Sequence, residues 1–305
     1  MLRTAASYER DELVARKRAD GTTVSVVLPA RNEAATIGAI LDAIRTQLTG
    51  AAPLVDEVLV VDSGSSDETA TVARAAGATV RAAADIRPDL GGSTGKGEAL
   101  WKGLLATTGD ILVFLDADLE AFDATAVVGL LGPLLLEPDV SFVKAAYDRP
   151  LLAGGELHAE GGGRVTELVA RPLLNAHWPE LGAIVQPLAG EFAARRPLLE
   201  SLPFVTGYGV DLALLIDVYD EVGIDGIAQV DLGTKRHRHQ SDAALGLMAA
   251  AIYRTVLERL DRSGRVKVLD EPSSRLVQFT RHAGQFIAAA TDIGIDERPA
   301  ACTVH

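Results

Sequence analysis

The chain has 305 residues, of which 48% are hydrophobic and 23% are charged, the composition of an ordinary soluble globular protein. Its net charge of −13 and isoelectric point near 4.9 argue against nonspecific binding to nucleic acid, so we expect no nucleic-acid partner. The single cysteine, Cys302, excludes an internal disulfide framework and fits a reducing, cytoplasmic location. Residues 1–21 lack the apolar core of a signal peptide, and no apolar run reaches the length of a bilayer span. We therefore expect no stable membrane association.

The first 150 residues alternate between strand and helix patterns. The strands are continuous apolar runs such as VSVVLPA, and the helices repeat apolar residues every three or four positions. This alternation predicts an α/β fold with a mostly parallel, Rossmann-like sheet, flanked by helices and joined by right-handed crossovers. The predicted elements are a helix at 6–18, a strand at 24–30, a helix at 33–48, a strand from 56, a helix ending at 76, a strand at 78–84, a helix at 95–109 and a strand at 110–118.

The pattern changes after residue 150. We expect a glycine-rich loop and an amphipathic helix at 154–174, a strand and a helix at 187–202, and a helix at 207–223. A strand from 226 then leads into a basic segment, and a further helix covers 242–262. The tail beyond residue 265 gives no clear prediction. The change of pattern divides the chain into residues 1–150 and 151–305.

Polar residues gather where three of the predicted strands end. The clusters cover 29–33, 62–67 and 116–118. Ligands of a parallel sheet bind outside the carboxyl ends of its strands, so this topology brings the three clusters together. Taken alone, the pair Asp116 and Asp118 is more often a polar turn or a helix cap. Its place beside the other clusters favours a binding site.

Two carboxylates at one strand end suit a hard divalent cation such as Mg²⁺ or Mn²⁺. A neutral imidazole is a further ligand that Mn²⁺ accepts, and the segment KRHRH at 235–239 offers His237 and His239. On its own this segment is equally well explained as a solvated basic loop. Beside a diphosphate and a metal ion it would bind anions.

Two glycine-containing segments are candidates for anion binding. GKGEAL at 95–100 places Lys96 at a helix start, but Gly97 breaks the P-loop spacing, which argues against an ATPase. No GxGxxG follows the first strand and no GxSxG is present, so a dinucleotide oxidoreductase and an α/β-hydrolase are also disfavoured. GGGRVTEL at 161–168 places Arg164 and Thr166 at a helix start, where backbone N–H groups favour phosphate or carboxylate. A flexible loop is the alternative explanation of its glycines.

Together these residues resemble the GT-A-fold, metal-dependent glycosyltransferases. The general likeness lies in PARNE at 29–33, VDSGSSDET at 61–69, GKGEAL and LDAD at 115–118. A narrower likeness, to the actinobacterial glucosyl-3-phosphoglycerate synthases and their mannosyl relatives, covers about residues 20–240. It lies in FVKAAYDRP at 142–150, GGGRVTEL, QPLAGEFAARR at 186–196, GYGVD at 207–211 and LGTKRHRH at 232–239.

The resemblance implies transfer of glucose from UDP- or GDP-glucose to the 2-hydroxyl of 3-phosphoglycerate, with retained configuration and with Mg²⁺ or Mn²⁺. Residues 1–150 would bind the nucleotide sugar, and residues 151–305 would bind the acceptor and form a C-terminal helical tail. A homodimer through 242–262 and the tail is also implied. The donor would be bound by Pro29, Ala30, Asn32, Glu33, Ser63, Lys96, Asp116, Ala117 and Asp211, of which Lys96, Asp116 and Asp211 would be catalytic. The acceptor would be bound by Gly163, Arg164, Val165, Thr166, Tyr208, Lys235 and His239, and the metal by Asp118 and His237.

Some positions depart from the family pattern. Asp211 stands where the family often has Glu, and Lys235 and His239 stand where it has Arg and Asn. Lys is a point charge without the bidentate fork of Arg, so anion binding could differ. Ala117 replaces a familiar Ser, which changes little if the backbone is the relevant group. Since no carboxylate is marked as a covalent nucleophile, the hypothesis for the mechanism is attack from the leaving-group face.

Four alternatives stay open. The first is a mannosyl-3-phosphoglycerate synthase using GDP-mannose, and the second is a family-2-like GT-A transferase acting on another acceptor. A sugar nucleotidyltransferase is disfavoured because PARNE stands where a G-x-G-T-R loop is expected. A silent binding protein is disfavoured because Asp116, Asp118 and His237 are all retained.

Overall fold

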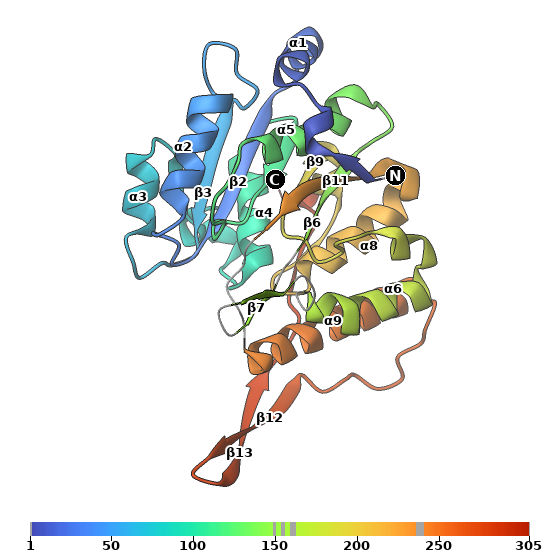
Figure 1. Ribbon diagram of the computed structural model, residues 1–305. Helices are drawn as coiled ribbons and strands as arrows, with labels where there is room; N and C mark the ends of the chain where they lie inside the picture. Colours follow the sequence, from blue (N-terminus) through green and yellow to red (C-terminus); the bar gives the residue numbers. More distant parts are fainter. Residues whose placement is uncertain (1, 149–150, 154–155, 159–162, 236–240, 305) are drawn as a thin grey trace.

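The centre of the molecule is an eight-stranded sheet (Figure 1). The computed structural model describes residues 2–148, 151–153, 156–158, 163–235 and 241–304. Every neighbouring pair of strands in the sheet is parallel except the two pairs made by β9. In spatial order the strands are β1 (Leu2–Thr4), β11 (Ile227–Thr234), β6 (Phe142–Asp148), β9 (Phe192–Arg195), β5 (Ile111–Phe114), β2 (Val24–Ala30), β3 (Glu57–Asp62) and β4 (Thr79–Ala82).

Helices cover both faces of this sheet, and each face has its own hydrophobic core. Alternate strand residues serve the two cores, so Val26 and Leu28 belong to one core and Val27 to the other. The first core is closed by α1 (Arg10–Asp20), α2 (Ile37–Leu48), α3 (Thr69–Ala75) and α5 (Thr125–Leu136). The second is closed by α4 (Lys96–Ala106), α6 (Arg171–His177), α7 (Arg196–Ser201), α8 (Val210–Val222) and α9 (Asp242–Arg262).

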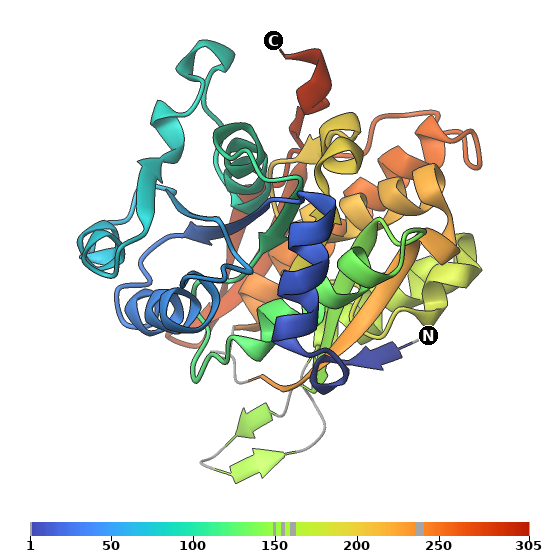
Figure 2. The same ribbon diagram turned by 90° about the horizontal axis from the view of Figure 1, so that it is seen from above.

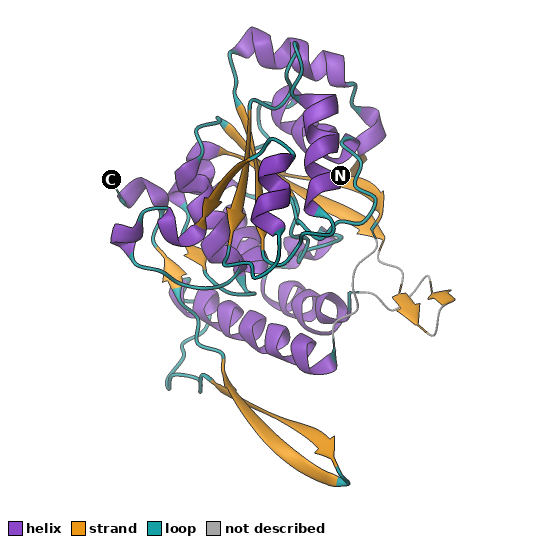
Figure 3. Ribbon diagram, turned by 90° about the vertical axis from the view of Figure 1, so that its left-hand side faces the viewer, coloured by secondary structure: helices purple, strands orange, loops and turns teal. Residues whose placement is uncertain are grey.

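Among the described residues, three small two-stranded sheets lie outside the central one. The ribbon of β7 (Leu151–Ala153) and β8 (Glu156–His158) stands away from the body (Figure 2). The hairpin of β12 (Arg275–His282) and β13 (Gln285–Asp292) projects from the body beside the start of α9, where Gln278 donates to the Ala243 carbonyl at 3.0 Å (Figure 3). A helical tail was expected beyond α9, and the strands of this hairpin correct that expectation. The strands β10 (Phe204–Val205) and β14 (Glu297–Arg298) pair antiparallel, which returns the end of the chain to the body.

The α/β class and the mostly parallel sheet predicted from the sequence are confirmed. The strand predicted at 110–118 ends at Phe114, so Asp116 and Asp118 lie in the turn that follows β5. The strand predicted near 187–202 is β9, and its antiparallel direction was not foreseen. Strands from both halves of the chain share the sheet, because β9 and β11 join strands from before residue 150. In the part of the chain that the structure describes, no helix combines the length and apolar character needed to cross a bilayer.

Candidate active site

The carboxyl ends of β2, β3 and β5 lie together at one edge of the sheet. Ala30 is opposite Asp62 in the register of β2 and β3, and the Ser63 N–H donates to the Ala30 carbonyl at 2.9 Å. Asn32 has a left-handed backbone with φ of 60°, and its Oδ1 accepts a hydrogen bond from the Ser66 N–H at 2.8 Å. These contacts fix the loop after β2 against the loop after β3.

The turn after β5 is tied to the same loops. The Thr36 hydroxyl, which is buried, donates to the Ala117 carbonyl at 2.6 Å. The Glu33 N–H donates to Thr69 Oγ1 at 2.8 Å, which links the loop after β2 to the start of α3. The three predicted polar clusters therefore form one continuous surface, as the topology required.

A chain of five alternating charges lies at this edge, and we call it the site network. Lys96, the first residue of α4, contacts Asp116 Oδ1 at 2.9 Å and Asp211 Oδ2 at 3.4 Å. Lys235, directly after β11, contacts Asp116 Oδ2 at 3.1 Å and Glu191 Oε2 at 2.9 Å. Each oxygen of Asp116 is therefore held by a different lysine.

The charges in the site network stabilise one another. Burial alone would raise the pKa of the Asp116 carboxyl, but Lys96 and Lys235 hold that pKa well below its usual range. Burial alone would lower the pKa of each lysine, but the neighbouring carboxylates raise both pKa values above the ordinary range. Asp116 is thus a fixed anion and both lysines are fixed cations at neutral pH. Burial raises the pKa of Glu191, which makes its ionised form depend on Lys235.

Asp118 differs from Asp116, although only one residue separates them. Burial and the Asp116 charge raise the pKa of the Asp118 carboxyl, so its surroundings destabilise the ionised form. Among the described residues, the carboxylates of this region are Asp116, Asp118, Asp211 and Glu191, and Lys96 and Lys235 form the ion pairs with three of them. Carboxylate oxygens are the ligands that suit a hard divalent cation such as Mg²⁺ or Mn²⁺.

The second predicted metal ligand, His237, lies outside the described residues, as does the predicted acceptor residue His239. Within the described residues, no three or more His, Cys, Asp or Glu side chains are grouped as a metal site. The pairing of Asp118 with His237 accordingly stays a prediction.

Gly190 shows how closely the site network is packed. A Cβ atom at this position would overlap Lys96 Nζ and Asp116 Oδ1. A side chain at this position would displace Lys96 or Asp116 from the ion pair. Its neighbour Glu191 is 2% exposed and belongs to the network.

The predicted acceptor residues Gly163 to Thr166 stand at the start of the helical segment that leads into α6. Gly163 has φ of 73°, and its carbonyl accepts from the Glu167 N–H at 3.0 Å. Thr166 is buried, and its hydroxyl has no hydrogen-bond partner among the described residues. Arg164 contacts Asp242, the first residue of α9, at 2.5 Å. Val165 is buried in the second core.

The structure therefore brings Lys96, Asp116, Asp211 and Lys235 into contact. Tyr208 lies in the turn between β10 and α8 with 55% of its surface exposed, close in sequence to Asp211. The Arg164 contact with Asp242 of α9 lies outside the site network, so among the described residues the predicted acceptor residues form more than one group.

Sequence reasoning missed three residues of this region. Glu191 was quoted within QPLAGEFAARR but not selected, although an acid inside an apolar strand pattern is a signal for a buried charge. The Tyr147 ring lies 4.8 Å from Lys235 Nζ. Lys144 is buried, and its Nζ donates to the Asp211 carbonyl at 3.4 Å.

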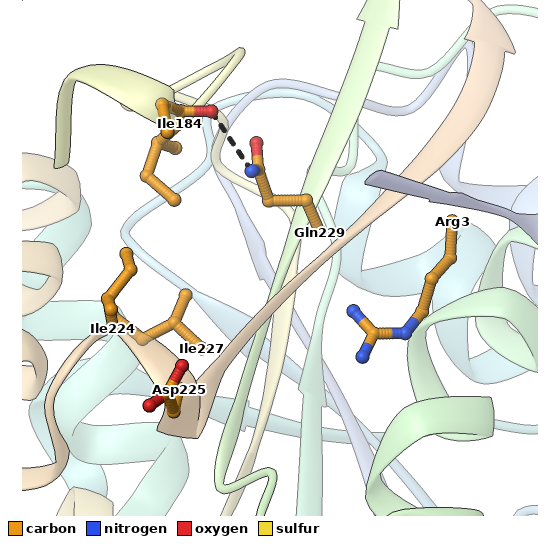
Figure 4. Close-up of a pocket in the computed structure, with 7 residues that line it drawn as sticks. Arg3, Ile184, Ile224, Asp225, Ile227 and Gln229 are labelled. Atoms are coloured by element: carbon orange, nitrogen blue, oxygen red, sulfur yellow. Dashed lines mark hydrogen bonds between the residues drawn. The ribbon is translucent and has the colours of Figure 1, made fainter. Parts of the chain in front are cut away.

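A separate pocket lies beside the start of β11, at the end of that strand opposite Lys235 (Figure 4). Two of its polar lining residues, Arg3 and Gln229, are already engaged. The Arg3 guanidinium contacts Glu137 at 2.9 Å, and Gln229 donates to the Ala183 carbonyl at 3.1 Å. The pocket offers few open polar groups to a ligand.

Comparison with known proteins places the chain in a family. Residues 25–149 match the family described as Glycosyl transferase family 2. The glucosyl-3-phosphoglycerate synthase of Petrotoga mobilis is 42% identical over 293 residues, which cover 96% of this chain and 90% of that protein.

Two solved structures are similar over nearly the whole chain. Mannosyl-3-phosphoglycerate synthase from Rubrobacter xylanophilus has a TM-score of 0.91 and 41% identity, covering 100% of this chain and 96% of that one. Glucosyl-3-phosphoglycerate synthase from Mycobacterium tuberculosis, in complex with Mn²⁺, UDP-glucose and phosphoglyceric acid, has a TM-score of 0.84 and 43% identity, covering 98% and 96%. Another complex of that enzyme contains Mg²⁺ and UDP.

The resemblance seen in the sequence and the GT-A fold that it implied are thereby confirmed. The chain belongs to the glucosyl-3-phosphoglycerate synthase family and is a glycosyltransferase.

Proposed function

We propose that this chain transfers glucose from UDP-glucose to the 2-hydroxyl of 3-phosphoglycerate, giving glucosyl-3-phosphoglycerate. The observation that carries the proposal is the site network at the carboxyl edge of the sheet, with Asp118 beside it, in a chain 43% identical to an enzyme solved with both substrates. Fixed lysine cations beside a carboxylate-rich position suit a nucleoside diphosphate and its metal ion.

The loops after β2 and β3 are the proposed site of the nucleoside. Pro29, Ala30, Asn32, Glu33 and Ser63 lie on these loops, and the hydrogen bonds between the loops keep the surface in place before the donor arrives. A preformed surface lowers the entropy lost on binding.

Asp118, with His237, is the proposed ligand set for Mg²⁺ or Mn²⁺. When bound, the cation supplies positive charge against the diphosphate, whose negative charge grows as the glycosidic bond breaks. Lys96 is a fixed cation beside that position and would stabilise the same charge.

The helix start at Gly163 to Thr166 is the proposed site of the acceptor phosphate. Its support is the buried Thr166 hydroxyl, which lacks a partner among the described residues, and the Arg164 guanidinium next to it in sequence. An anionic acceptor would compete with Asp242 for Arg164. Tyr208, Lys235 and His239 are proposed to complete the acceptor site.

We propose that the acceptor oxygen attacks C1 of glucose from the face that the diphosphate leaves. The bond from C1 to the diphosphate oxygen breaks, the bond from C1 to the acceptor oxygen forms, and the acceptor proton passes to the diphosphate. Asp116 is a poor covalent nucleophile because both of its oxygens are held by lysines. Asp211 is proposed to accept a hydrogen bond from a hydroxyl of the sugar, since its Oδ1 is buried without a hydrogen-bond partner among the described residues. Trapping a glycosyl adduct on Asp211 would contradict the proposed route.

A second candidate is mannosyl transfer from GDP-mannose. The TM-score of 0.91 with the mannosyl-3-phosphoglycerate synthase favours it, as does Asp211, whose side chain is one methylene shorter than the Glu often found in the family. The shorter Asp211 side chain would leave more space beside the sugar, which could admit mannose in place of glucose.

The test is a panel of donors and acceptors scored by mass spectrometry. We expect 3-phosphoglycerate to gain one hexose, with UDP-glucose the best donor and EDTA abolishing turnover. A higher kcat/KM with GDP-mannose would establish the second candidate. Turnover of another acceptor with every donor failing on 3-phosphoglycerate would refute both, and would favour a family-2-like transferase of different specificity.

We further propose a cytoplasmic homodimer that uses the β12–β13 hairpin. In the hairpin register one face collects Val277, Phe279 and Phe286, which are 45%, 65% and 70% exposed. An apolar stripe of this kind on a projecting hairpin fits a second copy of the chain. Light scattering should give twice the monomer mass, and Phe279→Asp should give the monomer, with Gln285→Asp on the same hairpin as the control.

The division of labour at residue 150 is also proposed as functional. The nucleoside loops lie before it, and Gly163, Arg164, Thr166 and Tyr208 lie after it. The two parts share one sheet, so they are not proposed as separately folding units.

A further inference from the structure

The end of the chain lies against the two elements that carry Lys96 and Asp211. We call residues 296–304 the C-terminal strap. The Thr206 N–H, between β10 and α8, donates to the Asp296 carbonyl at 2.9 Å. The Trp101 indole of α4 donates to the Pro299 carbonyl at 2.9 Å. The strap thus contacts both α4 and the segment that leads into α8.

Arg298 of the strap binds the first turn of α4 and the loop before it. Its guanidinium donates to both oxygens of Glu98, at 2.6 and 2.8 Å, and Glu98 is 3% exposed. It also donates to the carbonyls of Leu90 at 2.8 Å and Gly91 at 3.0 Å, and lies 5.1 Å from the Trp101 ring. Because the planar Arg298 guanidinium donates to four acceptors, it fixes the position of this turn relative to the preceding loop.

The first turn of α4 is in turn pressed against β10. The Glu98 N–H donates to the Thr206 carbonyl at 3.3 Å. A Cβ atom at Gly97 would overlap the Val205 carbonyl oxygen, so only glycine permits this approach. Since β10 pairs with β14, the start of α4, β10 and the strap form one packed stack, and Lys96 is the first residue of that helix.

Glu297, the residue before Arg298, holds the other element. Neighbouring residues of a strand point to opposite faces, so Glu297 reaches α9 while Arg298 reaches α4. Its carboxylate forms ion pairs with Arg259 and Arg262, both at 2.6 Å. Arg259 also binds both oxygens of Asp217, at 3.0 and 2.6 Å, and Asp217 lies on α8, the helix that carries Asp211 in its first turn.

We propose that Glu297 and Arg298 are positioning residues that together set the separation of Lys96 from Asp211. One residue fixes the helix that begins with Lys96, and the other fixes, through Arg259, the helix that carries Asp211. The two charged groups meet at 3.4 Å in the site network. The inference rests on the proposed function for the roles of Lys96 and Asp211, but the geometry that it explains exists without substrate.

The first test is Arg298→Lys, which keeps a cation beside Glu98 and loses the fork and the bonds to the loop. A displacement of about 1 Å at reacting groups costs as much as about 100-fold in rate, so we expect kcat to fall about 10- to 100-fold. The KM for UDP-glucose should change less than about twofold, because the nucleoside loops are untouched. Glu297→Gln should also lower kcat. This second variant keeps the proposal testable if Arg298→Lys folds poorly.

The matched control is Arg3→Lys. Arg3 also binds a glutamate with its fork, Glu137, at 2.9 and 2.5 Å, but it does so at the β1 edge of the sheet. If the Arg298 pair only stabilises the fold, both variants will lose comparable thermal stability and neither will lose kcat. That result would overturn the proposal.

The second test needs no turnover. Asp116 and Asp211 raise the pKa of Lys96 and keep it an ammonium ion, which should make it slow to react with acetic anhydride. In Arg298→Lys we expect Lys96 acetylation, followed by peptide mass spectrometry, to accelerate at least about threefold, as a pKa lower by half a unit would give. Lys17, which contacts Asp56 at 2.6 Å, is the internal reference, and Arg3→Lys should leave both rates unchanged.

The two tests separate the proposals. If the parent chain fails to glycosylate 3-phosphoglycerate, the proposed function is wrong, and Lys96 acetylation alone decides whether the strap positions this residue. An unchanged Lys96 rate in Arg298→Lys overturns the positioning role, whatever happens to kcat.

Discussion

Two charged networks each include an acid of α8, Asp211 in one and Asp217 in the other, and they are built from different cations. The site network uses Lys96 and Lys235, which make single-point contacts of 2.9 to 3.4 Å with Asp116, Asp211 and Glu191. The second network, which we call the clamp network, uses Arg259 and Arg298 to bind Asp217, Glu297 and Glu98. Four of the guanidinium contacts are arranged as forks, two on Asp217 and two on Glu98.

The difference has a physical meaning. The Lys96 side chain is 26% exposed and that of Arg259 is 2% exposed, so of these two cations only Lys96 can exchange a carboxylate for a phosphate from solution. Lys235 and Arg298 are 10% and 14% exposed, so for them the difference lies in the chemistry of the cation and not in exposure. An ammonium ion has three donors that rotate freely, whereas a guanidinium fork fixes its partner in a plane. The lysine network is suited to rearrange when a substrate binds, and the arginine network is suited to stay as it is.

The largest expected effect concerns the region of the site network. Asp118→Ala removes the proposed metal ligand, and we expect kcat/KM to fall at least about 1,000-fold, because stabilisation of a developing charge is lost. The thermal midpoint should stay close to that of the parent, since ionised Asp118 is not favoured by its surroundings. Steady-state kinetics with Mn²⁺ and a thermal melt provide the measurements.

Glu120→Ala is the matched control, because Glu120 is an exposed acid in the same loop. It should retain activity within about twofold, as expected of an exposed side chain outside the site. Equal losses in the two variants would remove Asp118 from the metal site.

Arg259→Met tests the clamp network. It leaves Asp217 and Glu297 without their buried partner, and we expect the free energy of unfolding to fall by about 3 kcal/mol. Urea denaturation measures this loss. Arg262→Met is the control, because Arg262 is 52% exposed and contacts only Glu297 in the clamp network, so we expect a loss under about 1 kcal/mol. Similar values for both variants would mean that burial does not distinguish the two arginines.

Lys235→Met tests whether Lys235 binds the acceptor or the donor. Asp116 keeps Lys96, and Glu191 can take up a proton because burial raises its pKa, so the fold should tolerate the change. We expect the KM for 3-phosphoglycerate to rise about thirtyfold, the value of a hydrogen bond to a charged group. Lys235→Arg should restore most of this loss. A rise confined to the KM for UDP-glucose would move Lys235 from the acceptor site to the donor site.

Much of the site could be predicted because it depends on local patterns and on one rule of topology. Apolar runs marked β2, β3 and β5, and the rule for parallel sheets placed Pro29, Ser63 and Asp116 at one edge. The contact of Lys96 with Asp116 joins residues from neighbouring elements of the same alternating pattern.

The remainder depends on long-range packing that no local pattern encodes. The antiparallel direction of β9, and with it the place of Glu191, follows from how the chain returns between β5 and β6. The C-terminal hairpin was missed because its turn is Ala283–Gly284, with φ of 47° and 83°. Such turns usually carry Asn or Asp before Gly, and Ala gives no such signal. Arg298 meets Glu98 across 200 residues, a pairing that only the folded chain reveals.

The smallest effect concerns the pH dependence of the site network. The two lysines hold the pKa of Asp116 well below that of the unfolded chain, which is about 3.9. Below about pH 4 the unfolded chain binds a proton at this position while the folded chain does not, so the stability due to Asp116 is lost as the pH falls. Between pH 4 and pH 3 the parent should lose about 1 kcal/mol more than Asp116→Asn, measured from urea midpoints. Parallel curves for the two proteins would show that Lys96 and Lys235 do not stabilise the Asp116 anion, and the site network would then lack the fixed charges that distinguish it from the clamp network.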